Sequence, residues 1–194
     1  MIHLEKVNWD NYEDVLKLKV TKEQEDFVAD NDISLIHAFL ALSDGEPVYA
    51  FAIYNDDKVV GFIQMGYDDD WTGEEHESWL NSDVYKKWEG KKYYFIWRFM
   101  IDKKYQKKGY GKEALIKAME FLRTKPNGDA EYITLSYERT NVVAKKLYAS
   151  LGFYEPVEFE PYYEEDDEIF AICKFWINRC QGYEPWHFSF PQKK

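Results

Sequence analysis

The chain has few of the residues that bind metals. It contains two cysteines, Cys173 and Cys180, and four scattered histidines in 194 residues. Neither set has the spacing of a metal site, so we expect no metal. We expect both cysteines to be reduced thiols packed in or near a strand. A reducing cytoplasm is the compartment expected for such a chain.

Long hydrophobic runs and an excess of positive charge are also missing. Residues 1–6 lack the apolar stretch of a signal peptide and no window is long enough to span a bilayer, so we expect no membrane association. Lys and Arg number 25 against 36 Asp and Glu, which gives a net charge of −11. Nucleic-acid binding needs a basic surface, so the charge argues against nucleic acid and favours cationic partners.

Aromatic side chains, in contrast, are abundant and make up 19% of the chain. The length fits one domain with a normal core, and the aromatics suffice for both that core and an aromatic-lined cleft. Hydrophobic periodicity predicts the order β-α-α-β-β-β-α-β-α-β-β without an internal repeat. The predicted strands are 2–7, 48–54, 59–65, 95–101, 132–137, 153–163 and 169–177, and the clearest predicted helices are 33–42, 111–122 and 141–151.

Two further segments fall outside this regular pattern. Residues 66–92 are polar and acidic but carry Trp71, Trp79 and Trp88. We expect this segment to be an insertion with a short helix around 78–87, anchored by buried tryptophans. The aromatic tail, 177–194, is expected to fold back over an apolar surface of a domain that spans 1–176.

One segment combines a strand, a glycine-bearing loop and a helix start. The apolar run Phe95–Ile101 is followed by the charged loop 106–112 with Gly109 and Gly111, and then by a helical pattern. A helix N-terminus presents several backbone N–H groups at one point, which suits a phosphate, and glycine lets the anion approach. The lysines of the loop, Lys107, Lys108 and Lys112, add positive charge.

Two common phosphate motifs do not fit this loop. A P-loop would need Gly at position 106 and Ser or Thr at 113, where the chain has Gln106 and Glu113. The dinucleotide fingerprint needs a third glycine where the chain has Ala114.

A second motif follows the predicted strand 132–137. It reads Asn141-x-x-Ala144-x-x-Leu147-Tyr148-x-x-x-Gly152-Phe153. Asn141 and Tyr148 are seven residues apart, two turns along one helix face, so both can face one groove.

These two segments resemble motifs A and B of the GNAT superfamily of acyl-CoA-dependent N-acetyltransferases. The loop matches [RQ]-x-x-G-x-[GA], with Gln106 where the family more often has Arg, and the second motif matches N-x-x-A-x-x-L-Y-x-x-x-G-F at every defining position. The resemblance covers roughly residues 2–176. It implies an α+β, three-layer fold with a mixed sheet of about seven strands, splayed between the fourth and fifth and flanked by helices.

The resemblance implies acetyl-CoA as co-substrate and a role for each matched residue. Tyr148 becomes the general acid that protonates the leaving thiolate, although a half-buried aromatic with no catalytic role is the alternative. Asn141 could be a helix cap alone, or a helix cap and a cofactor ligand together, and Gln106 could hold the loop without touching the cofactor. The residues implied in cofactor binding are Phe99, Met100, Ile101, Gln106, Lys107, Lys108, Gly109, Tyr110, Gly111, Lys112, Asn141, Lys145 and Tyr148.

An amine acceptor must lose a proton before it attacks, and the base is the least defined part of the site. The candidate carboxylates are Glu25 and Asp26, in the loop that borders the acceptor site in this family, with Trp97 as a further acceptor contact. Polyamine acetyltransferases of the family often place an acid on the central strand, where this chain has Trp97 and Arg98. A water relay is therefore the preferred expectation.

Two observations predict a linear polyamine such as spermidine or spermine as acceptor. Gln24-x-x-Phe27-Val28 and the run 97–102 resemble the bacterial spermine/spermidine (diamine) acetyltransferases. The acidic loops 68–77 and 164–168 carry no Lys or Arg and could attract a polycation. The alternatives are an aminoglycoside, a protein N-terminus or lysine, and a non-catalytic acyl-CoA-binding module, and a homodimer remains open.

Overall fold

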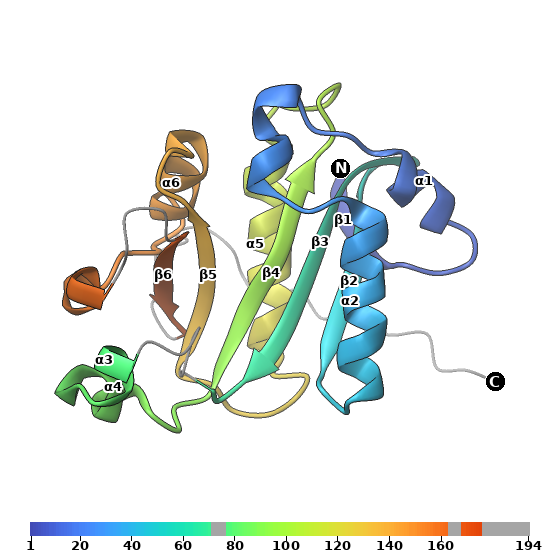
Figure 1. Ribbon diagram of the computed structural model, residues 1–194. Helices are drawn as coiled ribbons and strands as arrows, with labels where there is room; N and C mark the ends of the chain where they lie inside the picture. The colour runs from blue at the N-terminus through green and yellow to red at the C-terminus, as the bar shows by residue number, and fades with distance from the viewer. Residues whose placement is uncertain (71–76, 163–167, 176–194) are drawn as a thin grey trace.

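The protein is built on one mixed, six-stranded sheet, shown in the computed structural model of Figure 1, which describes residues 1–70, 77–162 and 168–175. The strands lie in chain order, and neighbours are antiparallel except for β4 and β5, which are parallel. Their bounds are β1 Ile2–Lys6, β2 Val48–Asn55, β3 Lys58–Asp68, β4 Tyr93–Ile101, β5 Tyr132–Glu138 and β6 Glu168–Lys174.

The described sheet has one strand fewer than the sequence predicts, because residues 153–162, the described part of the predicted strand 153–163, do not form one. Of these residues, Tyr154 alone pairs with the sheet, in a single antiparallel bridge to Ile172. The chain then forms a short 3-10 helix, η2 Val157–Tyr162. Pro156 and Pro161 flank and interrupt this stretch, and proline has no N–H to donate to a strand ladder.

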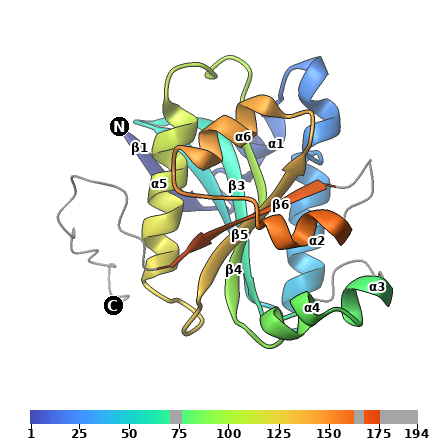
Figure 2. The ribbon, with the colours of Figure 1, turned by 90° about the vertical axis from the view of Figure 1, so that its left-hand side faces the viewer.

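Helices cover both faces of the sheet and give three layers (Figure 2). On one face lie α5 Tyr110–Arg123 and α6 Val142–Ala149, and on the other lie α1 Tyr12–Lys17, the 3-10 helix η1 Lys22–Phe27 and α2 Asn31–Ser43. The expected fold is therefore confirmed, apart from the strand count. Among the described helices, none is long and apolar enough to cross a membrane.

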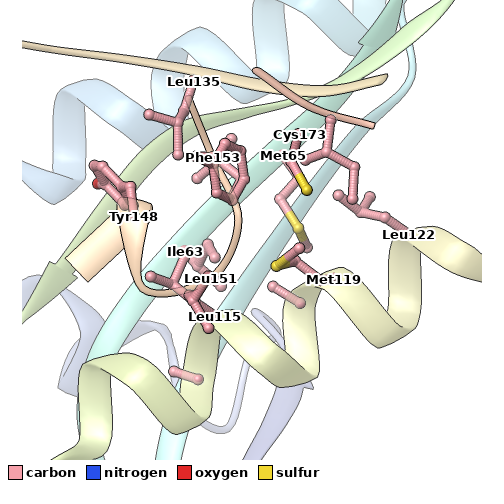
Figure 3. Close-up of a cluster of buried hydrophobic side chains, with 14 of the residues drawn as sticks. Ile63, Met65, Leu115, Met119, Leu122, Leu135, Tyr148, Leu151, Phe153 and Cys173 are labelled. Atoms are coloured by element: carbon pink, nitrogen blue, oxygen red, sulfur yellow. The ribbon is translucent and has the colours of Figure 1, made fainter. Parts of the chain in front are cut away.

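The main core lies between the sheet and α5 (Figure 3). Leu115, Met119 and Leu122 recur at helical spacing and are fully buried against β3 residues such as Ile63 and Met65. Figure 3 also shows side chains from α6 and the turn after it in this cluster. The packing of α5 on the sheet fixes the position of the helix N-terminus. The glycine loop leads into that N-terminus and is therefore held in place with it.

Helix α2 reverses the usual amphipathic pattern. The side chains it buries are Asn31, Ser34, Ala38 and Ala41, all small or polar. Five of its large apolar side chains are exposed, including Phe39 at 68%, while Leu35 is partly buried against the sheet. Helical spacing in the sequence predicted the helix correctly but did not show which face is buried.

The segment between β3 and β4 carries two short helices, α3 Glu77–Leu80 and α4 Asp83–Trp88. Trp88 is buried, and its ring lies 4.9 Å from that of Tyr132 and 5.2 Å from that of Phe159. Trp79 is partly buried in the same cluster, with its ring 5.0 Å from that of Phe159. Two of the predicted tryptophan anchors are thus described, whereas Trp71 falls outside the described residues.

The thiol of Cys173 is buried in β6 and takes part in no disulfide with another described residue. The predicted aromatic tail, 177–194, and Cys180 with it lie outside the described residues.

Strands β4 and β5 part halfway along their length, as Figure 1 shows. They pair only from Tyr93 opposite Tyr132 to Ile96 opposite Leu135. Beyond these residues β4 continues to Ile101 and β5 to Glu138 without pairing with each other. The expected splay between the fourth and fifth strands is therefore present.

The packing of α5 can be tested with Leu115→Ala. Leu115 has no exposed surface, so the change leaves a cavity, and we expect a loss of about 2–5 kcal/mol in the free energy of unfolding. The matched control is Leu40→Ala on α2, where Leu40 is 52% exposed and the expected change is within about 0.5 kcal/mol. Urea denaturation followed by circular dichroism measures both, and equal losses would contradict the assignment of the core.

Candidate active site

A cavity of about 510 Å³ occupies the gap between the parted ends of β4 and β5. It extends from the loop before α5, past α6, to η1 and the residues that follow η1. Because the gap opens the sheet itself, this cleft connects the α5 side of the sheet with the α1 and α2 side. Two molecules can therefore meet in it from opposite faces.

The α5 end of the cleft has the backbone features that favour an anion. Gly109 is the N-cap of α5 with φ +85°, and Lys107 also has a positive φ, 62°. Among the described residues, no protein acceptor takes the backbone N–H groups of residues 108 to 111. Free N–H groups at a helix N-terminus, together with the helix dipole, favour a phosphate group.

The side chain of Gln106 ties this loop to its neighbours. Its Nε2 donates to Gln24 Oε1 at 2.8 Å and to the carbonyl of Ile101 at 2.9 Å. Gln24 Oε1 also accepts from the backbone N–H of Thr21 at 3.2 Å. The amide thus connects η1, β4 and the loop, which favours the loop-holding alternative over direct contact of this side chain with a cofactor.

Helix α6 brings Asn141 and Tyr148 to the same cleft, as their spacing predicted. Asn141 caps the helix, because its Oδ1 accepts from the backbone N–H of Ala144 at 3.1 Å. That bond uses the acceptor of the side chain, so its Nδ2 is the part that can donate to a bound molecule.

Tyr148 lies inside the cleft wall with 8% of its surface exposed. Its ring packs 5.6 Å from that of Tyr137 and 6.0 Å from that of Phe153. Among the described residues, none forms a hydrogen bond with its hydroxyl. Burial, and then the negative charge of Glu168, raise the pKa of Tyr148 to about 12, so its phenol is neutral and carries a proton at physiological pH.

A bulge in β4 shapes the opposite end of the cleft. Gln64 of β3 pairs with Arg98 and Met65 with Ile96, so Trp97 is the extra residue. Its ring stacks on His37 of α2, with centroids 6.0 Å apart and planes 19° apart. Bulges re-aim side chains, and this one directs Trp97 toward the α2 side of the sheet.

Arg98 adds a cation at the same place. Its guanidinium lies 5.5 Å from the Trp97 ring, and its Nη1 donates to the Trp97 carbonyl at 2.9 Å. Its Nε is buried and has no hydrogen-bond partner among the described residues. Burial lowers the pKa of Arg98, while the charge of Glu168 raises it.

Glu168 supplies a carboxylate to the cleft from the first residue of β6. The hydroxyl of Ser136, on the parted end of β5, donates to Glu168 Oε2. Both residues line the cleft, as does Asp26 from η1.

Most of the predicted site residues come together here. Those that line the cleft are Asp26, Trp97, Phe99, Met100, Ile101, Gln106, Lys107, Gly109, Tyr110, Gly111, Lys112, Asn141 and Tyr148.

Three predicted residues do not line the cleft. The Lys145 ammonium pairs with Glu155 at 2.9 Å, and that of Lys108 lies 5.4 Å from the ring of Tyr105. Glu25 lies on η1 beside Asp26, and successive side chains of a 3-10 helix point about 120° apart, so only one of them faces the cleft.

Ser136 and Glu168 also line the cleft, although no motif in the sequence predicts them as site residues. Glu168 ends an acidic run, and nothing in the sequence distinguishes it from its acidic neighbours. Ser136 is one polar residue in a predicted strand. Only the sheet, which places the end of β5 beside the start of β6, brings them together. Among the described residues, no cluster of three or more His, Cys, Asp or Glu side chains could hold a metal ion.

Comparisons with known structures agree with this geometry. The chain is similar to the PaiA N-acetyltransferase of Thermoplasma acidophilum in complex with coenzyme A, with 14% identity, a TM-score of 0.56, and 90% of this chain and 99% of that chain covered. It is similar to a Bacillus subtilis acetyltransferase in complex with CoA, with 14% identity, a TM-score of 0.54, and 90% and 99% covered. A GNAT family acetyltransferase from Elizabethkingia anophelis with acetyl-CoA bound gives 14% identity, a TM-score of 0.53, and 89% and 97% covered.

At such identities these likenesses show the fold alone. No curated protein sequence matches the chain significantly. The model of the acetyltransferase (GNAT) family matches residues 5–153, a span that includes the glycine loop, the parted strands and Tyr148. The chain therefore belongs to the GNAT family of acetyltransferases.

Proposed function

We propose that the protein transfers an acetyl group from acetyl-CoA to a primary amine of a small molecule. The acceptor that we favour is a polyamine such as spermidine or spermine. Family membership supports an acetyl group and its CoA thioester as donor. The observation that carries the proposal is the single cleft that runs through the sheet past the Tyr148 hydroxyl. Donor and acceptor can meet there in a ternary complex.

The α5 end of the cleft is assigned to acetyl-CoA. The unpaired N–H groups of residues 108 to 111 and the lysines Lys107 and Lys112 would hold the pyrophosphate. The edge of β4 beyond Ile96 would pair with the amides of the pantetheine arm like an added strand, as would the Asn141 Nδ2. The same backbone groups can polarise the thioester carbonyl.

Tyr148 is assigned as the general acid. Its hydroxyl is buried, neutral and without a partner among the described residues, so it can donate its proton to a leaving thiolate. The proposal has the amine attack the thioester directly. The described cysteine, Cys173, does not line the cleft, so it offers no nucleophile for a covalent acyl-enzyme.

The acceptor is assigned to the end of the cleft near η1 and Trp97. Gln24, Phe27 and Val28, which carry the resemblance to polyamine acetyltransferases, all line the cleft there. Asp26 and Glu168 add carboxylates, and Trp97 adds an aromatic face for an ammonium group. Asp68, Asp69 and Asp70 of the first acidic loop do not line the cleft, so that part of the charge argument rests on long-range attraction.

A second acceptor class is favoured by Arg98. A partly buried arginine with a buried, unpaired Nε suits an acceptor that also carries a carboxylate or a carbonyl, as an amino acid or a peptide does. An acceptor screen at constant acetyl-CoA, with spermidine, a monoamine, an aminoglycoside and a short peptide, decides between the classes. Binding of acetyl-CoA without turnover of any amine would favour the non-catalytic module instead.

The glycine loop provides the test of the cofactor site. A Cβ on Gly111 would lie 3.6–3.8 Å from Ile101, Phe99 and Leu147, an ordinary contact, so the larger Gly111→Val extends into the cleft. We expect the KM for acetyl-CoA to rise about tenfold or more, since a hydrogen bond to a charged group contributes roughly 1.5–3 kcal/mol.

The matched change is Gly109→Ala, where φ is +85°. It should cost about 1–2 kcal/mol of folding free energy because an L residue is strained there. Steady-state kinetics and thermal unfolding separate the two effects, and equal loss of stability in both variants would indicate a purely structural turn.

Tyr148→Phe tests the general acid. We expect kcat to fall roughly 10²-fold or more, with little change in acetyl-CoA affinity, because only the transition state needs the proton. The control is Tyr137→Phe, since the Tyr137 hydroxyl is already bonded to Glu155. With a pKa of about 12, Tyr148 keeps its proton up to about pH 11, so wild-type kcat should show no alkaline loss from it below that pH. An unchanged kcat in Tyr148→Phe would remove this residue from the mechanism.

Salt dependence tests the polyamine. Raising ionic strength from low salt to about 1 M shortens the Debye length from about 30 Å to about 3 Å, so it should weaken the apparent binding of spermidine much more than that of butylamine. The measurement is the KM of each amine across a salt series, with the KM of acetyl-CoA as the internal reference. Turnover of spermidine no faster than that of butylamine would count against a polyamine.

A further inference from the structure

We propose that Glu168 receives the ammonium group of the acceptor and takes its proton, with Ser136 as the residue that positions the carboxylate. This inference rests on the proposed function, because it assigns a role within the same reaction. Neither residue belongs to the two motifs of the sequence, and the role falls to β6, a strand outside both of them.

The geometry of the carboxylate suits this role. The Ser136 hydroxyl donates to Oε2 of Glu168, which fixes the carboxylate at the mouth of the gap between β4 and β5. No described residue donates a hydrogen bond to Oε1. An oxygen without a donor, in a side chain that lines the cleft, can accept from an incoming ammonium.

The charge of Glu168 reaches the centre of the site. It acts on Tyr148, whose pKa it raises, and on Arg98, whose pKa it raises against the effect of burial. Tyr148 packs with its ring 5.6 Å from that of Tyr137, and Tyr137 is the register partner of Ile169, the residue after Glu168. Glu168 therefore lies beside the proposed proton donor, whereas Asp26, the other carboxylate that lines the cleft in the described part of the chain, lies on η1.

Arg98 strengthens the case for proton transfer over simple binding. It forms no ion pair with Glu168 within 4.0 Å, so the carboxylate is left open to a ligand. A guanidinium beside the acceptor site disfavours the ammonium form of an amine and favours its neutral form. Among the described residues, the other charged side chains that line the cleft are Lys107 and Lys112 at the α5 end and Asp26 on η1. Glu138, the register partner of Glu168 on β5, does not line it.

The proton balance of the reaction follows from these positions. The acceptor ammonium gives one proton to Glu168, and the nitrogen lone pair then forms the C–N bond as the C–S bond breaks. The departing sulfur takes the electron pair of that bond and the phenolic proton of Tyr148. The second proton of the nitrogen returns to the Tyr148 oxygen. Glu168 is exposed, so it releases its proton to water, and the products are an amide, a thiol and one free proton.

The test uses Glu168→Gln and Glu168→Ala in the full chain, with the amine that the wild-type protein acetylates fastest. We expect kcat to fall roughly 10²–10⁴-fold in both, the usual contribution of a general base. Added formate should restore part of the activity of Glu168→Ala, because it can occupy the space of the lost carboxylate and accept the proton. Acetyl-CoA affinity and the thermal unfolding midpoint should stay at wild-type values. Ser136→Ala should give a smaller loss of kcat.

The control is Glu138→Gln, which removes the same charge from the register partner of Glu168 without touching the cleft lining. It should leave kcat within about threefold of wild type. Wild-type kcat in Glu168→Gln would overturn the inference while the proposed function stands. A loss confined to the KM of the amine, or one that formate does not reverse, would overturn the proton transfer. The proposed function itself fails if the wild-type protein acetylates no amine, whether or not it binds acetyl-CoA.

Discussion

The parting of β4 and β5 is the constraint on which the rest of the site depends. Parallel pairing ends at Ile96 and Leu135, and beyond these residues two strand edges face each other across a cleft instead of bonding. A sheet gives up main-chain hydrogen bonds there, and such groups are costly when buried without partners. A ligand with its own amide groups can satisfy them, which makes the gap a binding site by its backbone alone.

The elements around the gap keep it open. On one face, α5 packs on the sheet through fully buried side chains, and its N-terminus lies at the gap. The N–H groups of residues 108 to 111 there have no acceptor among the described residues. On the other face the bulge at Trp97 turns the strand and stacks its ring on α2. The Gln106 amide links the glycine loop to η1, so both faces are tied across the cleft. A distortion of one face would therefore also displace residues on the other face.

The charged and titratable side chains at the site also come from different elements around the gap. Tyr148 is buried against Tyr137 of β5 and Phe153 in the turn after α6, so its phenol holds its proton. Glu168 and Arg98 approach it from β6 and β4, two strands that are not neighbours in the sheet. All three side chains line the cleft that opens where β4 and β5 diverge. In the proposed reaction Tyr148 gives its proton to the departing sulfur, and Glu168 takes one from the attacking nitrogen.

The sequence determined the parts of the protein that are local. The glycine loop and the helix after it, the cap at Asn141 and the orientation of Tyr148 all follow from residues close together in the chain, and the structure places them as the spacing predicted. The sequence failed where an element depends on distant contacts. Residues 153–163 alternate like a strand, yet the prolines leave only Tyr154 bridged to the sheet. Helix α2 was expected from its apolar spacing, yet its small residues face the sheet.

Only the tertiary structure decided which charged side chains enter the cleft. Lys108, Lys145 and Glu25 sit in or beside the predicted site segments, but Glu155 and Tyr105 hold the two lysines elsewhere and η1 directs Glu25 away. Glu168 and Ser136 are 32 residues apart and carry no motif, and the pairing of β5 with β6 makes them neighbours. A sequence motif specifies the backbone conformation that a cofactor requires, and that conformation is local. The position of an acceptor-side charge depends on how separate strands pack, and no short stretch of sequence contains that information.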